Sequence, residues 1–261
     1  MNVKLVKIVL IAVGCALMFG CETTPTGNSS SVYNETALAS RARSHTDLGA
    51  AYYQQGKLEI ALDEFNRAVE IDPTYSQAHN GLGLVYAALN EDAKADASFK
   101  RAIQVQPGSS EAHNNYGSFL CAHKRYDESI TQFLEAVKNP LYSTPNLAYA
   151  NAGICSVRKN DTKNAEVYLN KALQIEPLTY SAAYQLADIQ FKRGDVTTAQ
   201  KTLQNALIGS PSPETLWLGI RIARVQGDKD AEASYALQLR QQYPNAEQTR
   251  LLLSGQKSPN G

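Results

Sequence analysis

Several side chains that could do chemistry fall within one short segment, EAHNNYGSFLC, which runs from Glu111 to Cys121. A histidine, asparagines and a cysteine this close together could form a metal site or a nucleophilic site. Similar segments, however, place His45, His79 and His113 at intervals of 34 residues. A fixed interval of this length marks an internal repeat, so the histidine is a repeat position.

The repeat spacing argues against a metal site at these histidines. Equivalent positions on packed helices lie about 10 Å apart, whereas zinc–nitrogen bonds need about 2 Å. We therefore expect no metal and interpret the three rings as packing residues in a slot that Tyr149 and Trp217 fill in later copies.

The second half of the unit repeats as well. Its markers are Ala61, Phe65, Ala68 and Pro73, then Ala95, Phe99, Ala102 and Pro107, with weaker copies at Phe133 and Ala136, at Ala165, Leu169, Ala172 and Pro177, at Ala199, Leu203, Ala206 and Pro211, and at Ala233 and Leu237. The segment NPLYSTPN adds two residues after the third copy. The markers therefore define six units, at about 42–75, 76–109, 110–145, 146–179, 180–213 and 214–246, and a tail at 247–261.

This pattern resembles the tetratricopeptide repeat, a unit of two antiparallel helices. The resemblance implies an all-α superhelical solenoid. Its markers make physical sense, because glycines such as Gly49 and Gly83 allow two helices to approach closely. Prolines such as Pro73 stand where the chain must leave the second helix. Gly56 and Gly194 fit the turn between the two helices.

The first 20 residues predict a secretory signal. Lys4 and Lys7 precede an apolar run, Ile8 to Gly20, that is too short for a membrane span of about 20 residues. Gly20-Cys21 resembles the cleavage site of bacterial lipoproteins, which implies lipidation of Cys21, with palmitate as an acyl chain, and a flexible tether over residues 21–40. Glu22, where an aspartate would imply inner-membrane retention, favours the periplasmic face of the outer membrane. An uncleaved anchor and a plain secretory peptide are the alternatives.

Catalysis is not expected from this sequence. It contains no phosphate-binding glycine loop, Cys-x-x-Cys pair or His-Glu-x-x-His motif, so we predict no enzyme and no cofactor. Its 25 basic and 25 acidic residues balance, which gives no field to attract nucleic acid.

The functional surface implied by the resemblance is a groove lined by the first helix of each unit. We expect it to bind a peptide, because it mixes apolar residues with asparagines that can both donate to and accept from a peptide backbone. For Asn115 and Asn151 the alternative is bonding between neighbouring repeats. The predicted groove residues are Ala50, Tyr53, Asn80, Leu84, Ala87, Asn114, Asn115, Asn151 and Ile154. The sixth unit, with Arg221 and Arg224, is expected to be a solvating cap.

Two further cysteines, Cys121 and Cys155, fall on the first helices of adjacent units. An oxidising compartment would favour a disulfide between them, and two small buried hydrophobic residues are the alternative. Their motifs, NNYGSFLC and NAGIC, together with the lipoprotein signal, resemble the pilotin lipoproteins of type IV pilus biogenesis. This resemblance implies binding of secretin subunits, their localisation and multimerisation in the outer membrane, and a role in twitching motility. Another outer-membrane repeat lipoprotein, which organises cell-wall enzymes or β-barrel assembly, is the alternative.

Overall fold

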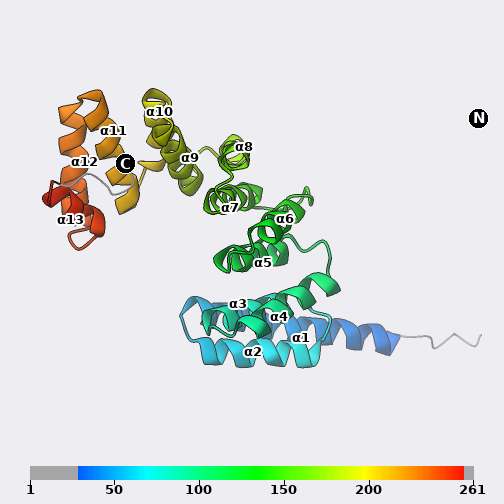
Figure 1. The fold of residues 1–261 in the computed structure, drawn as a ribbon. Coiled ribbons are helices and arrows are strands. Elements are labelled where there is room, and N and C mark those ends of the chain that lie inside the picture. Colours follow the sequence, from blue (N-terminus) through cyan, green and yellow to red (C-terminus); the bar gives the residue numbers. More distant parts are fainter. Residues whose placement is uncertain (1–28, 256–261) are drawn as a thin grey trace, which may run out of the picture. The chain divides into compact units, whose positions relative to one another are not determined.

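The computed structural model describes residues 29–255, and within them the chain forms helices and no strands. The helices are α1 (Ser29–Gln54), α2 (Leu58–Ile71), α3 (Ser76–Ala88), α4 (Asp92–Val105), α5 (Ser110–Ala122), α6 (Tyr126–Ala136), α7 (Pro145–Arg158), α8 (Thr162–Ile175), α9 (Tyr180–Lys192), α10 (Val196–Ala206), α11 (Pro213–Gln226), α12 (Lys229–Gln242) and α13 (Glu247–Leu253). The chain divides into Met1–Ala37 and Leu38–Gly261, and the repeats lie in the second unit. From α3 to α12 the helices pack in successive pairs, as Figure 1 shows, which confirms the prediction of an all-α solenoid.

In the first four pairs a glycine of the first helix faces a large side chain of the second, whereas the fifth pair has Ala187 at this position. A Cβ atom at this glycine would lie closer to the opposing side chain than real Cβ atoms do, so no other residue fits without a shift. An added Cβ atom would lie 2.9 Å from Phe65 at Gly49, 2.6 Å from Phe99 at Gly83, 2.8 Å from Phe133 at Gly117 and 2.6 Å from Leu169 at Gly153. The absence of a side chain at one position therefore sets the distance between the helices.

The turn between the two helices of each pair uses one residue with positive φ. Glycine takes this left-handed conformation at no steric cost, and it occurs at Gly56, Gly194 and Gly227. Asn90, Lys124 and Asn160 adopt it as well, with φ of 59°, 61° and 66°. The turn geometry is therefore the same in all six pairs, although only three of them have glycine.

A half-buried carboxylate, Asp96, connects the second and third units. Tyr116 Oη donates to Asp96 Oδ1 at 2.8 Å, and Arg125 Nη1 donates to the same oxygen at 2.6 Å. Burial raises the pKa of Asp96, but hydrogen bonds from Lys100, Arg125 and Tyr116 outweigh it and hold that pKa below its usual value. Burial, followed by the hydrogen bond to Asp96, raises the pKa of Tyr116 to about 12. The phenol therefore remains a donor at neutral pH.

The sixth unit differs in register from the sequence prediction. A Cβ atom at Gly219 would lie 3.0 Å from the Tyr235 ring, the same sixteen-residue pairing that Gly83 and Phe99 make. The expected markers Ala233 and Leu237 are instead exposed. The marker positions of the sixth unit therefore lie two residues earlier than predicted. Tyr235, not Leu237, occupies the position that Phe99 has in the second unit.

The expectation of a solvating cap is wrong for Arg221. Its side chain is only 15% exposed and its guanidinium lies 4.7 Å from the centre of the Phe191 ring. Arg224 is more exposed and pairs with Glu232 at 2.7 Å. The covering element is α13, in which Thr249 is buried and which packs against α11 and α12. The segment 247–261, expected as a tail, thus contributes a helix.

Helix α1 corrects the predicted tether over part of its length. It begins at Ser29, so residues 29–40 are helical rather than extended. The physical reason is composition, because no glycine or proline interrupts residues 29–48 and alanine, leucine and arginine favour helix. None of the helices between residues 29 and 255 combines the length and apolar content that crossing a membrane requires.

The glycine contact can be tested with Gly83→Ala. We expect a loss of about 1–3 kcal/mol in the free energy of unfolding, because the new methyl group would overlap the Phe99 ring. This loss outweighs the ~0.5–1 kcal/mol that alanine contributes over glycine within a helix. Circular dichroism melts would measure it.

The matched control is Gly108→Ala, at a glycine with open space around it and no positive φ. It should leave stability unchanged or raise it slightly. Equal melting temperatures for the two variants would show that the close approach does not constrain the helix pair.

Candidate functional site

A cavity of about 370 Å³ lies on the first helices of units one to three. Its lining residues are Thr46, Asp47, Ala50, Tyr53 and Gln54 of α1, Phe65 of α2, Tyr75, then Gln77, Asn80, Gly81 and Leu84 of α3, and Glu111 of α5. Four of the predicted groove residues, Ala50, Tyr53, Asn80 and Leu84, therefore line one cavity.

The Phe65 ring lies beneath this cavity, and Gly81 allows the ring to pack directly against the backbone of α3. A Cβ atom at Gly81 would lie 2.2 Å from that ring, so a side chain at this position would displace it. Phe65 is 3% exposed and belongs to the core cluster of the first two units. Because the ring is largely covered, an apolar ligand side chain would contact mainly the half-buried residues around it, Ala50, Tyr53 and Leu84.

The wall of the cavity has an acidic character. Asp47 and Glu111 are exposed, and the lining residues include no lysine or arginine. Burial raises the pKa of the Tyr75 phenol. The charge of Arg43 lowers this pKa, and the nearby carboxylates of Asp47 and Asp72 raise it. The cavity therefore favours an apolar segment with a basic side chain over one with an acidic side chain.

The asparagines form two bridges between neighbouring units. Asn115 Nδ2 donates to Asn80 Oδ1 at 3.2 Å, and Asn151 Nδ2 donates to Asn114 Oδ1 at 3.1 Å. The structure therefore has Asn115 and Asn151 bonded to neighbouring repeats, the alternative that the sequence left open. The other polar atom of each amide makes no hydrogen bond within the described residues. These atoms are the Nδ2 donors of Asn80 and Asn114 and the Oδ1 acceptors of Asn115 and Asn151.

The remaining predicted groove residues lie outside the cavity. Ala87 packs with Leu84 against the core cluster around Phe99 and Tyr116. Ile154 of α7 is half-buried. Asn114, Asn115 and Asn151 are likewise half-buried, so the strip continues along α5 and α7 outside this cavity.

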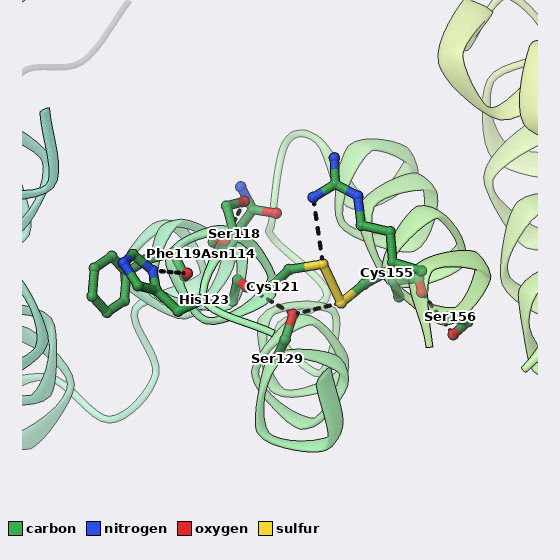
Figure 2. The surroundings of a disulfide bond; sticks show 11 residues. Asn114, Ser118, Phe119, Cys121, His123, Ser129, Cys155 and Ser156 are labelled. Atoms are coloured by element: carbon green, nitrogen blue, oxygen red, sulfur yellow. Dashed lines mark hydrogen bonds between the residues drawn. A yellow bond between two sulfur atoms is a disulfide. The ribbon is translucent and has the colours of Figure 1, made fainter. Parts of the chain in front are cut away.

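A disulfide joins Cys121 of α5 to Cys155 of α7, with Cα atoms 5.9 Å apart (Figure 2). Cys155 Sγ contacts Ser129 Oγ at 3.3 Å, and Ser129 Oγ donates to the carbonyl oxygen of Gly117 at 2.7 Å. Arg158 Nη1 lies 3.9 Å from Cys121 Sγ on the other side. The bond connects units three and four, across the junction that contains the two inserted residues.

The histidines are buried to different degrees and each has its own partners. Nε2 of His79 and of His113 each contacts the oxygen of the preceding proline, Pro73 or Pro107, at 2.9 Å. His45 Nδ1 lies 2.6 Å from Glu64 Oε2. The rings of His79 and His113 therefore hold the loops that enter units two and three, in addition to filling space.

His123, to which the sequence assigned no role, links two units. Its Nε2 atom lies 3.0 Å from Asp92 Oδ2 at the start of α4, and its ring packs against Phe119 with centroids 4.3 Å apart. No repeat marker occupies this position, so the pattern contained no signal for it. Cys21 lies outside the described residues.

Family models for the tetratricopeptide repeat match residues 49–90, 82–144, 148–177 and 184–247. The type IV pilus assembly protein PilF of Pseudomonas aeruginosa is 31% identical over 247 residues, which cover 94% of this chain and 96% of that protein. A solved structure of Pseudomonas aeruginosa PilF has a TM-score of 0.77 at 30% identity, covering 84% of this chain and 100% of its own. The structure of PilW, a type IV pilus biogenesis factor, has a TM-score of 0.72 at 30% identity, covering 81% and 98%.

The disulfide should stabilise the junction between units three and four. Replacing both cysteines, as Cys121→Ala with Cys155→Ala, should cost about 3–4 kcal/mol, the loop-closure entropy of a 34-residue separation. Thermal melts with and without dithiothreitol would measure the loss.

The oxidised parent should respond to dithiothreitol and the double variant should not. If the melting temperature of the parent is the same in both conditions while mass spectrometry shows full reduction, the bond contributes nothing to stability.

Proposed function

The chain belongs to the tetratricopeptide-repeat family, among the type IV pilus biogenesis proteins that include PilF and PilW, and from this we propose that it acts as a pilotin. In this role it binds secretin subunits of the pilus pore and promotes their localisation and multimerisation in the outer membrane. It is a scaffold and not a catalyst.

The observation that carries this proposal is the cavity over Phe65. It combines apolar walls at Ala50 and Leu84 with the unpaired amide nitrogen of Asn80. Peptide segments present the matching features, since an apolar side chain can fill the cavity while the backbone bonds to the amides. The acidic residues Asp47 and Glu111 favour a secretin segment with a basic side chain beside the apolar one.

The anchor is proposed from the sequence alone, because Cys21 lies outside the described residues. A lipidated Cys21 would hold the repeats at the periplasmic face of the outer membrane. The exported compartment is also the one in which the disulfide between Cys121 and Cys155 would persist. Retention at the membrane would raise the local concentration of the groove for arriving secretin subunits.

The anchor proposal predicts that Cys21→Ser releases the folded chain into the soluble periplasmic fraction, because the thiol is the lipid acceptor. Secretin multimers in the outer membrane and surface pili should decrease in the same cells. Membrane fractionation and immunoblots of unboiled samples would measure both results.

Cys15→Ser is the control, because this cysteine lies within the apolar run of the signal and should not affect retention. Full outer-membrane retention and normal piliation of Cys21→Ser would contradict the anchor. Normal piliation together with envelope or division defects on deletion of the chain would instead favour a general envelope adaptor.

The groove proposal predicts that Ala50→Glu weakens secretin binding by about 2 kcal/mol, or roughly 30-fold, because the carboxylate would occupy the desolvated centre of the cavity. Titration of the purified chain with secretin subunits would measure the affinity, and circular dichroism would check the fold.

Ala51→Glu is the matched control, since Ala51 is exposed on the same helix and does not line the cavity. It should bind with the affinity of the parent. A folded Ala50→Glu variant that binds as tightly as Ala51→Glu would place the secretin site elsewhere.

A further inference from the structure

The two asparagine bridges present the same pair of free polar atoms at two successive junctions of the groove. At the junction of units two and three the pair is Asn80 Nδ2 and Asn115 Oδ1, and at the junction of units three and four it is Asn114 Nδ2 and Asn151 Oδ1. None of these atoms is among the side-chain atoms of the described chain that are both fully buried and without a hydrogen bond. Each junction therefore offers one donor and one acceptor to a ligand.

These pairs are confined to the two junctions beside the cavity. Between units one and two, the position equivalent to Asn115 is Gly81, which has no side chain, and the cavity lies there instead. Between units four and five, the position equivalent to Asn114 is Ala150, which offers no side-chain acceptor. The groove thus has an order along the chain, with the cavity first and the two amide pairs after it.

A donor and an acceptor side by side match the C=O and N–H groups of a peptide backbone. Because the same pair occurs twice, it recognises a feature that repeats along the ligand, and the backbone is such a feature. An α-helical ligand cannot make these bonds, since its backbone groups are bonded within the helix. The pairs therefore favour an extended segment.

The spacing of the two pairs distinguishes between extended conformations. Equivalent positions on neighbouring first helices lie about 10 Å apart. A polyproline II segment turns the same side to the groove every three residues, or about 9 Å, and its N–H and C=O groups are free of internal bonds. A β-strand repeats a side at about 7 Å or about 13 Å, and neither fits the spacing.

The spacing is fixed where the second pair lies. The disulfide of Cys121 with Cys155 joins α5 to α7, the helices that carry Asn114 and Asn151, and Figure 2 shows Asn114 on the same helix as Cys121. The amide pairs are therefore held at a set separation before any ligand arrives, which lowers the entropic cost of binding.

We propose that the groove binds an extended peptide in the polyproline II conformation, in which two residues about three positions apart bond through their backbone to the asparagine bridges. An apolar residue about three positions further along occupies the cavity at Ala50 and Leu84. Proline is accepted between these positions but not at the bonded residues, because it lacks the N–H group. The inference rests on the proposed peptide-binding groove, but it does not require the peptide to come from a secretin.

The test uses two synthetic peptides and the full chain. The first is N-acetyl-RLPPAPPA-amide, in which leucine suits the cavity, arginine suits Asp47 and Glu111, and the alanines carry the N–H groups. It is also made in the reverse order, APPAPPLR, and the tighter binder is used. In the second peptide L-lactate replaces both alanines, which exchanges each N–H for an ester oxygen. Isothermal titration calorimetry should show saturable binding of the first peptide and at least tenfold weaker binding of the second.

Asn151→Ala removes one acceptor, so it should weaken binding of the alanine peptide threefold or more and narrow the difference between the two peptides. The matched control is Asn170→Ala, at an exposed asparagine on α8 away from the first helices, which should bind like the parent. Circular dichroism would check the fold. If Asn151→Ala does not fold, the comparison of the two peptides on the parent chain still decides.

The proposal is overturned if the alanine peptide does not bind in either order, if the lactate peptide binds equally well, or if folded Asn151→Ala binds like Asn170→Ala. Titration with secretin subunits separates this result from the proposed function. Secretin binding that Ala50→Glu weakens, without binding of the alanine peptide, would contradict the polyproline II ligand alone. Binding of the alanine peptide without binding of secretin would contradict only the partner.

Discussion

The structure depends on the close approach, in the first four helix pairs, of a glycine in the first helix to a large ring or side chain in the second. The contact at Gly83 and Phe99 is closer than any other residue type at the glycine position allows. It buries the ring completely and brings the backbones of α3 and α4 together. Because this face of the first helix is used for pairing, a neighbouring face, about 100° further around the helix and carrying Ala50 and Leu84, is left to form the groove. The fold and the candidate site thus have one cause.

The junction between units three and four shows how the chain accommodates an irregularity. Two inserted residues interrupt the regular spacing there, and a solenoid is stabilised mainly by contacts between neighbours. Among the links that cross the junction, two join the first helices: the disulfide of Cys121 with Cys155 and the side-chain hydrogen bond from Asn151 to Asn114. Both come from the first helices, so they hold the groove face in register where the loop on the other side is longer.

The sequence was sufficient to predict the helix pairs because their markers recur at fixed spacing and each has a steric reason. It was insufficient in the sixth unit, where Ala233 and Leu237 resembled markers but Tyr235 makes the contact with Gly219. Only the packed structure distinguishes these registers, since all three residues are compatible with helix. The groove was predicted as a strip on four helices, and the structure places four of its residues around one cavity beside the Phe65 ring. That grouping depends on contacts between units, which no periodicity reports.

The packing at Trp217 and Arg221 escaped prediction for a related reason. Tryptophan and arginine at these positions were interpreted as a packing residue and a solvating one, because each was considered alone. Their surroundings come from α13 and α9: the guanidinium of Arg221 stacks on the Phe191 ring and pairs with Asp188, and α13 packs against α11. In a solenoid each unit contacts only its neighbours, so these contacts stabilise the sixth unit with little direct effect on the groove at Ala50.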